Sequence, residues 1–122
     1  MNDQFQLYDL KVEVVATDRP MVCSHHAGDY FTVVGENICF PGDCRSFSMY
    51  ALSALLPLLP AKQRVTDRND WMRSDAEIAC PDPNCGARFR ITRIGRRAFS
   101  HSECTVVPID NEEASSCGND MN

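Results

Sequence analysis

The chain carries seven cysteines among its 122 residues, and this odd number constrains how it can fold. An odd set of thiols cannot be fully paired within one chain, so a closed disulfide framework is excluded. The fold must therefore depend on a hydrophobic core, and 43% of the residues are hydrophobic, an ordinary share for a globular protein. At this length we expect a single domain that buries about 60–70% of its unfolded surface.

Two features of the sequence predict a soluble, cytoplasmic protein. The N-terminus lacks the basic and apolar regions of a secretory signal. The apolar stretch from Tyr50 to Leu59 is interrupted by Pro57 and is far shorter than the roughly 20 residues of a membrane helix. In the reducing cytosol, cysteines serve as metal ligands, catalytic groups or buried apolar residues more often than as structural disulfides.

The distribution of charge argues against nucleic acid as a partner. The formal net charge is −5, which does not attract a polyanion. Basic residues nevertheless form one run, made of Arg88, Arg90, Arg93, Arg96 and Arg97. We interpret this run as the solvated face of a strand, with a small anionic ligand or the acidic C-terminal segment of the chain as the alternative partner.

The hydrophobic periodicity predicts an α+β domain over residues 1–100, with a small, mostly antiparallel sheet and one main helix packed on it. Alternating or β-branched segments predict strands at residues 7–16, 30–34, 38–40, 77–80 and 87–94. In the last of these, we expect Phe89, Ile91 and, after a one-residue slip, Ile94 to point inward. Helical spacing begins near Arg45, with Ser46 or Asp43 as the expected cap.

Two boundaries are also marked in the sequence: the end of the predicted helix and the start of the C-terminal segment. Pro57 and Pro60 are expected to end or kink the helix, because proline removes a backbone donor and clashes with the preceding turn. Residues 101–122 contain five acidic residues and no lysine or arginine. We predict that this acidic segment is a disordered tail.

Two segments place pairs of cysteines at the ends of turns that contain proline and aspartate. CFPGDC runs from Cys39 to Cys44, and CPDPNC runs from Cys80 to Cys85. Such turns can direct two thiolates toward one point, and zinc is commonly held by four ligands that come as two pairs. The spacing favours a zinc site, with free thiols at turns as the alternative.

A third group, Cys23-Ser24-His25-His26, offers one thiol and two imidazoles within four residues of a predicted loop. This is a reasonable half-site for zinc, iron or copper, although loop histidines are often simply exposed. Cys44 directly precedes the predicted helix, where unpaired backbone N–H groups and Arg45 would stabilise a thiolate. Cys44 is therefore the candidate catalytic cysteine, with an inert thiol under the helix as the alternative.

Several motifs occur in a fixed order between residues 7 and 94. They are YDLKVEVV, Cys23 followed by Gly28-Asp29-Tyr30-Phe31, Cys44 followed by YALSALLPLLPAKQR, Asp70-Trp71-Met72, the CPDP turn at Cys80, and the arginine-rich strand. As a set they resemble a family of small, uncharacterised, cysteine-containing bacterial proteins. The resemblance implies that Cys23, Cys44 and Cys80 are the recurring thiols. It implies no particular reaction.

These observations leave three functions open. The first is a metal-binding domain, with zinc or iron held by Cys23, Cys44 and Cys80. The fourth ligand would come from His25, His26, Cys85 or from outside the chain. A fourth position left open would allow the metal site to perform catalysis. The second is a thiol-dependent enzyme that uses Cys44 with one of the two histidines. The third is a non-catalytic accessory module, dimeric through an edge of its sheet. Whether the protein is an enzyme is left open.

Overall fold

A computed structural model describes residues 3–42 and 46–110 of the chain. The chain divides into two compact units, one formed by Gln6–Arg97 and the other by Met1–Phe5 with Ala98–Asn122. The elements are β1 (Gln4–Val15), β2 (Tyr30–Val34), β3 (Asn37–Cys39), α1 (Met49–Leu55), α2 (Leu59–Gln63), α3 (Trp71–Ser74), β4 (Glu77–Ala79), β5 (Arg88–Ser100) and α4 (His101–Cys104). Among the described residues, no helix has the length and apolar character that crossing a membrane requires.

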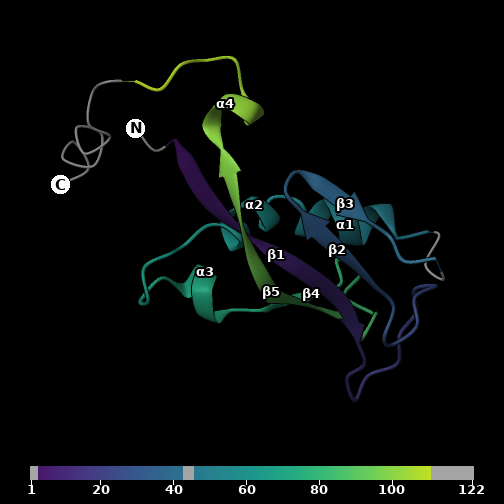
Figure 1. The fold of residues 1–122 in the computed structure, drawn as a ribbon. Coiled ribbons are helices and arrows are strands. Elements are labelled where there is room, and N and C mark those ends of the chain that lie inside the picture. The colour runs from purple at the N-terminus through teal and green to yellow at the C-terminus, as the bar shows by residue number, and fades with distance from the viewer. Residues whose placement is uncertain (1–2, 43–45, 111–122) are drawn as a thin grey trace. The chain divides into compact units, whose positions relative to one another are not determined.

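The strands form one five-stranded sheet in the order β3-β2-β1-β5-β4 (Figure 1). β1 pairs antiparallel with β2, β2 with β3, and β4 with β5. In the β1–β2 register, Val12 lies opposite Phe31 and Leu10 lies opposite Val33, so the apolar residues of both strands share one face. The prediction of an α+β fold with a mostly antiparallel sheet is confirmed.

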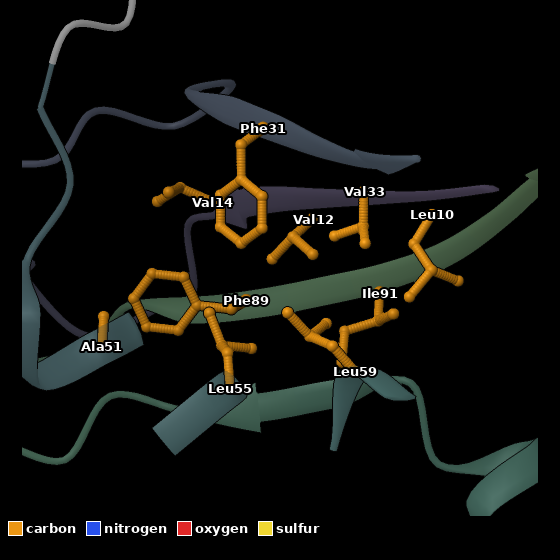
Figure 2. Close-up of a cluster of buried hydrophobic side chains, with 10 residues drawn as sticks. All are labelled: Leu10, Val12, Val14, Phe31, Val33, Ala51, Leu55, Leu59, Phe89 and Ile91. Carbon is orange, nitrogen blue, oxygen red and sulfur yellow. The ribbon is translucent and has the colours of Figure 1, made fainter. Parts of the chain in front are cut away.

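The hydrophobic core lies between this face of the sheet and the first two helices (Figure 2). Strands β1, β2 and β5 and helices α1 and α2 contribute its ten buried residues, which are Leu10, Val12, Val14, Phe31, Val33, Ala51, Leu55, Leu59, Phe89 and Ile91. The predicted inward alternation of β1 is thus confirmed, because every second residue from Leu10 to Val14 is buried.

The predicted single main helix is replaced by two short ones. α1 begins after Ser48, whose Oγ accepts a hydrogen bond from the Ala51 N–H at 3.3 Å, and it ends at Leu55. The cap is therefore Ser48, and residues 43–45, where the helix was expected to start, lie outside the described residues. Pro57 has no N–H with which to continue α1, and Pro60 lies in the first turn of α2, where a missing N–H costs nothing.

The expected slip in the last strand does not occur. Ile94 is 52% exposed, and the inward position after Ile91 is taken by Arg93. The Arg93 guanidinium lies over the Tyr8 ring at 4.2 Å, and its Nε donates to the Lys62 carbonyl at 2.9 Å. A long arginine can continue the inward face because the free carbonyls at the end of α2 accept its N–H groups.

Two polar side chains at the end of α2 are buried and tie the helix to its neighbours. The Lys62 ammonium donates to the carbonyls of Met72 and Asp75, and Gln63 Nε2 donates to the Gly35 carbonyl at 2.6 Å. Burial, with a smaller contribution from the nearby Arg93, lowers the pKa of Lys62. These contacts connect α2 to α3 and to the turn between β2 and β3.

The arginine run of β5 has partners within the same unit. Arg90 forms an ion pair with Glu77 at 2.8 Å, and Arg97 forms one with Asp9 at 2.9 Å. Both arginine side chains remain about half exposed. These pairs agree with our interpretation of the run as a solvated strand face at Arg90 and Arg97, whereas Arg93 points inward.

In the second unit, residues at the start of β1 contact residues at the end of β5 and at the start of α4. The rings of Phe5 and Phe99 stack with their centroids 5.7 Å apart, and the His101 N–H donates to the Asp3 carbonyl at 2.9 Å. Helix α4 falls within the segment 101–122 that was predicted as a tail. Residues 111–122 lie outside the described residues.

Candidate functional site

Three cysteines from two separate loops meet at one end of the core. Cys23 lies in the loop that joins β1 to β2, and Cys80 and Cys85 lie at the ends of the turn that joins β4 to β5. The Sγ atoms of Cys23 and Cys85 are 3.6 Å apart. Cys85 also acts on the Cys80 thiol, whose pKa burial raises and Cys85 raises further. We refer to Cys23, Cys80 and Cys85 as the thiol cluster.

Backbone contacts around Gly86 hold the two loops together. The Gly86 N–H donates to the Pro20 carbonyl at 2.8 Å, and Thr17 Oγ1 donates to the Gly86 carbonyl at 2.7 Å. A Cβ atom at Gly86 would lie 2.3 Å from the backbone oxygen of Arg19. Only glycine allows this close approach of the two backbones, so Gly86 lets the loop that carries Cys85 pack against the loop that carries Cys23.

The turn from Cys80 to Cys85 is fixed by its own aspartate. Asp82 Oδ1 accepts the Asn84 N–H at 2.9 Å, and the Asp82 carbonyl accepts the Cys85 N–H at 3.0 Å. The Cys80 N–H donates to the Ala87 carbonyl at 3.2 Å, which closes the turn. Asp82 therefore has the turn-forming role typical of aspartate in such sequences.

Each sulfur of the cluster also accepts a hydrogen bond from the backbone N–H two residues later in the chain. These donors are His25 for Cys23, Asp82 for Cys80 and Ala87 for Cys85. Backbone N–H groups aimed at a sulfur stabilise its thiolate form. The two loops thus offer the same arrangement of donors to all three thiols.

Cys85 receives the largest share of these donors. Its burial raises the pKa of the thiol, but N–H bonds from Ala87, Val22 and Cys23 outweigh burial and lower the pKa to about 6. The Val22 N–H lies 3.3 Å from the Cys85 sulfur. Burial raises the pKa of Cys23 and that of Cys80. At neutral pH the cluster therefore holds one thiolate beside two thiols.

A cavity of about 510 Å³ opens beside the cluster. Cys23 and Cys80 line it together with Val22, Ser24, Ser48 and Tyr50. Cys85 is only 2% exposed and is not part of the wall. Two of the three sulfurs are therefore accessible from the cavity, and the thiolate is covered.

The structure gives His25 a structural role. Its Nε2 accepts the Ser48 N–H at 3.1 Å, so the loop after β1 is tied to the start of α1. Its ring packs on Phe47 with the centroids 4.3 Å apart, and Asp29 Oδ2 lies 3.9 Å from Nδ1. Because Nε2 is already an acceptor, it is unavailable to a metal in this arrangement. His26 has an exposed side chain.

The remaining predicted thiols fall outside the cluster or outside the described residues. Cys39 in β3 and Cys104 in α4 are exposed. Cys44, the predicted catalytic residue and third recurring thiol, is not among the described residues, and neither is Cys117. Within residues 3–42 and 46–110, no group of three or more His, Cys, Asp or Glu side chains is arranged to hold a metal ion.

The main residue that sequence reasoning undervalued is Cys85. The sequence predicts it as one of several fourth ligands, whereas the structure places its sulfur 3.6 Å from that of Cys23, where it adds to burial in raising the pKa of Cys80. The C-x4-C spacing to Cys80 indicates Cys85, and Gly86 directly after it is a second signal, since a glycine allows another backbone to approach closely.

Comparison of the chain with known protein families, curated proteins and solved structures gives no match.

Proposed function

We propose that this chain is a metal-binding domain in which the close pair Cys23 and Cys85 holds zinc, or alternatively iron, as thiolates. Cys80 moves in as a third ligand when the metal binds, since these three thiols, all among the described residues, do not already form a metal-holding group. The observation that carries the proposal is the 3.6 Å separation of the Cys23 and Cys85 sulfurs. Zinc–sulfur bonds of about 2.3 Å place two sulfurs of a tetrahedral site at roughly 3.8 Å from each other. The closest pair of the thiol cluster is therefore near the spacing that zinc requires.

The backbone donors give this proposal further support. Metal thiolates carry more negative charge than thiols, and N–H groups that already face the sulfurs stabilise that charge without any rearrangement. One thiolate is present at neutral pH because the pKa of Cys85 is about 6. Binding would then release the protons of Cys23 and Cys80, as thiolate ligation requires.

The fourth ligand is proposed on the sequence alone. Cys44 is our first choice, because the resemblance to the bacterial family includes it among the recurring thiols. His25 is a weaker choice, because its Nε2 already accepts the Ser48 N–H. A site with three thiolates and an exchangeable fourth ligand could also perform catalysis, since the cavity reaches Cys23 and Cys80.

The test is metal analysis of the full chain, purified without a histidine tag. We expect about one zinc per chain, whereas less than about 0.2 metal per chain after zinc addition would refute the proposal. Replacing zinc by cobalt should produce thiolate-to-cobalt absorption bands. Cys85→Ser and Cys23→Ser should lose these bands, and Cys39→Ser, at an exposed cysteine, serves as the matched control. Cys44→Ser reports on the fourth ligand.

A thiol-dependent enzyme is the second candidate and is favoured by the low pKa of Cys85. Its thiolate is covered, however, so a substrate would need to reach it through Cys23 or Cys80. This candidate predicts one cysteine that is alkylated much faster than the others near neutral pH. Uniform, slow alkylation of all seven thiols would refute it.

A further inference from the structure

The cavity reaches one sulfur of a close pair and leaves the other sulfur covered. Cys23 lines the cavity wall, whereas Cys85 is 2% exposed and lies behind it. Their Sγ atoms are 3.6 Å apart, so an approach of about 1.6 Å would bring them to the S–S bond length of about 2.05 Å. An accessible thiol in contact with a buried one is the arrangement that thiol–disulfide exchange uses.

We propose that Cys23 and Cys85 reduce a small organic disulfide that enters this cavity, and that the two cysteines are themselves joined by a disulfide bond. This activity goes beyond metal binding and does not depend on it. The chemical class of the substrate is a low-molecular-weight disulfide, RSSR, whose two halves leave as thiols.

The cavity has the size and the walls that such a substrate needs. Its volume of about 510 Å³ lies in the range of small-molecule sites. The exposed side chains of Val22 and Tyr50 offer apolar contact, and Ser24 and Ser48 add polar groups to the same wall. A small disulfide held there would meet the Cys23 sulfur before any buried thiol.

The exchange takes place in two steps. First, the Cys23 sulfur forms a bond to one sulfur of RSSR, the S–S bond of RSSR breaks, and one RSH leaves with the proton of the Cys23 thiol. Second, the Cys85 thiolate attacks the Cys23 sulfur, the mixed S–S bond breaks, and the second half leaves as RS⁻, which takes a proton from water to become RSH. The two cysteines lose two electrons in total, and one RSSR gains them.

The loops are already held in the position that the second step requires. The Val22 N–H donates to the Cys85 sulfur at 3.3 Å, and the Gly86 N–H donates to the Pro20 carbonyl at 2.8 Å. The segment before Cys23 is therefore fixed against the segment after Cys85. Because the two sulfurs are in contact before any reaction, the second step should be intramolecular and fast.

The experiment uses the full chain, reduced, freed of metal with a chelator and treated with 2-hydroxyethyl disulfide. Peptide mapping by mass spectrometry should find a Cys23–Cys85 linked peptide as the main product. In Cys85→Ser, a mixed disulfide with mercaptoethanol should persist on Cys23, because the resolving thiol is missing. Cys39→Ser, which changes an exposed cysteine, should behave like the unchanged chain.

Three results would overturn the proposal: no intramolecular link in the unchanged chain, a link from Cys85 to Cys80 or another cysteine as the main product, or modification of exposed cysteines alone. Circular dichroism of each variant shows whether it is folded. The peptide map of the unchanged chain tests the proposal even if a variant fails to fold. Zinc bound at the proposed metal site would occupy both sulfurs and slow the formation of the link. A Cys23–Cys85 link that forms equally fast in the presence of zinc would therefore contradict the metal site, while it would support this proposal.

Discussion

Gly86→Ala should destabilise the protein and separate the two loops that carry the thiol cluster. The new Cβ would lie 2.3 Å from the Arg19 backbone oxygen and 2.6 Å from its carbonyl carbon. Ordinary contact distances are about 3.5 Å, so the backbones of the two loops must move apart by roughly 1 Å. Both partners are backbone, and no side-chain rotation can relieve the clash.

The size of the effect follows from two terms. Forcing extra volume into a closely packed region costs about 1–3 kcal/mol. The same movement weakens the hydrogen bond from the Gly86 N–H to the Pro20 carbonyl, for about 1 kcal/mol more. A total of about 2–4 kcal/mol should lower the midpoint of thermal unfolding by at least about 8 °C in a domain of this size.

The matched control is Gly95→Ala, in an exposed part of β5. A Cβ at Gly95 would meet only Asp9 Oδ2, at an ordinary distance of 3.9 Å, so this variant should be as stable as the parent or slightly more stable. Urea and thermal unfolding of the metal-free proteins measure both changes. If Gly86→Ala is as stable as Gly95→Ala, the close approach of the loops is wrong, and so is our explanation for the thiol cluster.

Three further predictions concern buried polar groups. Burial lowers the pKa of His25, so below the ordinary value of 6.5 the unfolded chain binds the proton more readily than the folded chain, and the free energy of unfolding should fall as the pH decreases. His25→Gln should flatten this dependence of the unfolding free energy on pH, and an unchanged dependence would contradict the prediction. Lys62→Met should cost about 1–3 kcal/mol in urea unfolding because two part-buried carbonyls lose the buried ammonium that donates to them, whereas Lys11→Met, at a half-buried side chain, should cost less than half as much. Arg93→Met should raise the exchange rate of amide hydrogens in α2, which loses the guanidinium contacts to its final carbonyls, while Arg90→Met should leave that rate unchanged.

Much of the sheet could be predicted from the chain because the relevant signals are local. Alternation in β1 identified the buried set from Leu10 to Val14, and β2 was predicted at the residues where it occurs. The inward side of β5 was correct at Phe89 and Ile91 but wrong at Ile94, because alternation alone cannot foresee an arginine that reaches helix carbonyls. The single predicted helix became two for a reason visible in the sequence, namely its prolines.

The candidate site was predicted less completely than the fold. Cysteine spacing indicated that Cys80 and Cys85 could act together, and the resemblance indicated Cys23. Neither signal indicated that Cys85 is the covered thiol in contact with Cys23, or that His25 accepts a hydrogen bond from the start of α1. These features depend on partners from distant segments, and hydrophobic periodicity contains no information about them.

The sequence by itself determined that the chain folds on a hydrophobic core and that its thiols cannot all be paired. It also determined the strand pattern, since a strand repeats every two residues along the chain. Only the tertiary structure decided which thiols meet. Cys23 and Cys85 are 62 residues apart, and they touch because the loops around Pro20 and Gly86 fit together without a side chain between them. Such a contact depends on shape across the fold, which no local pattern records.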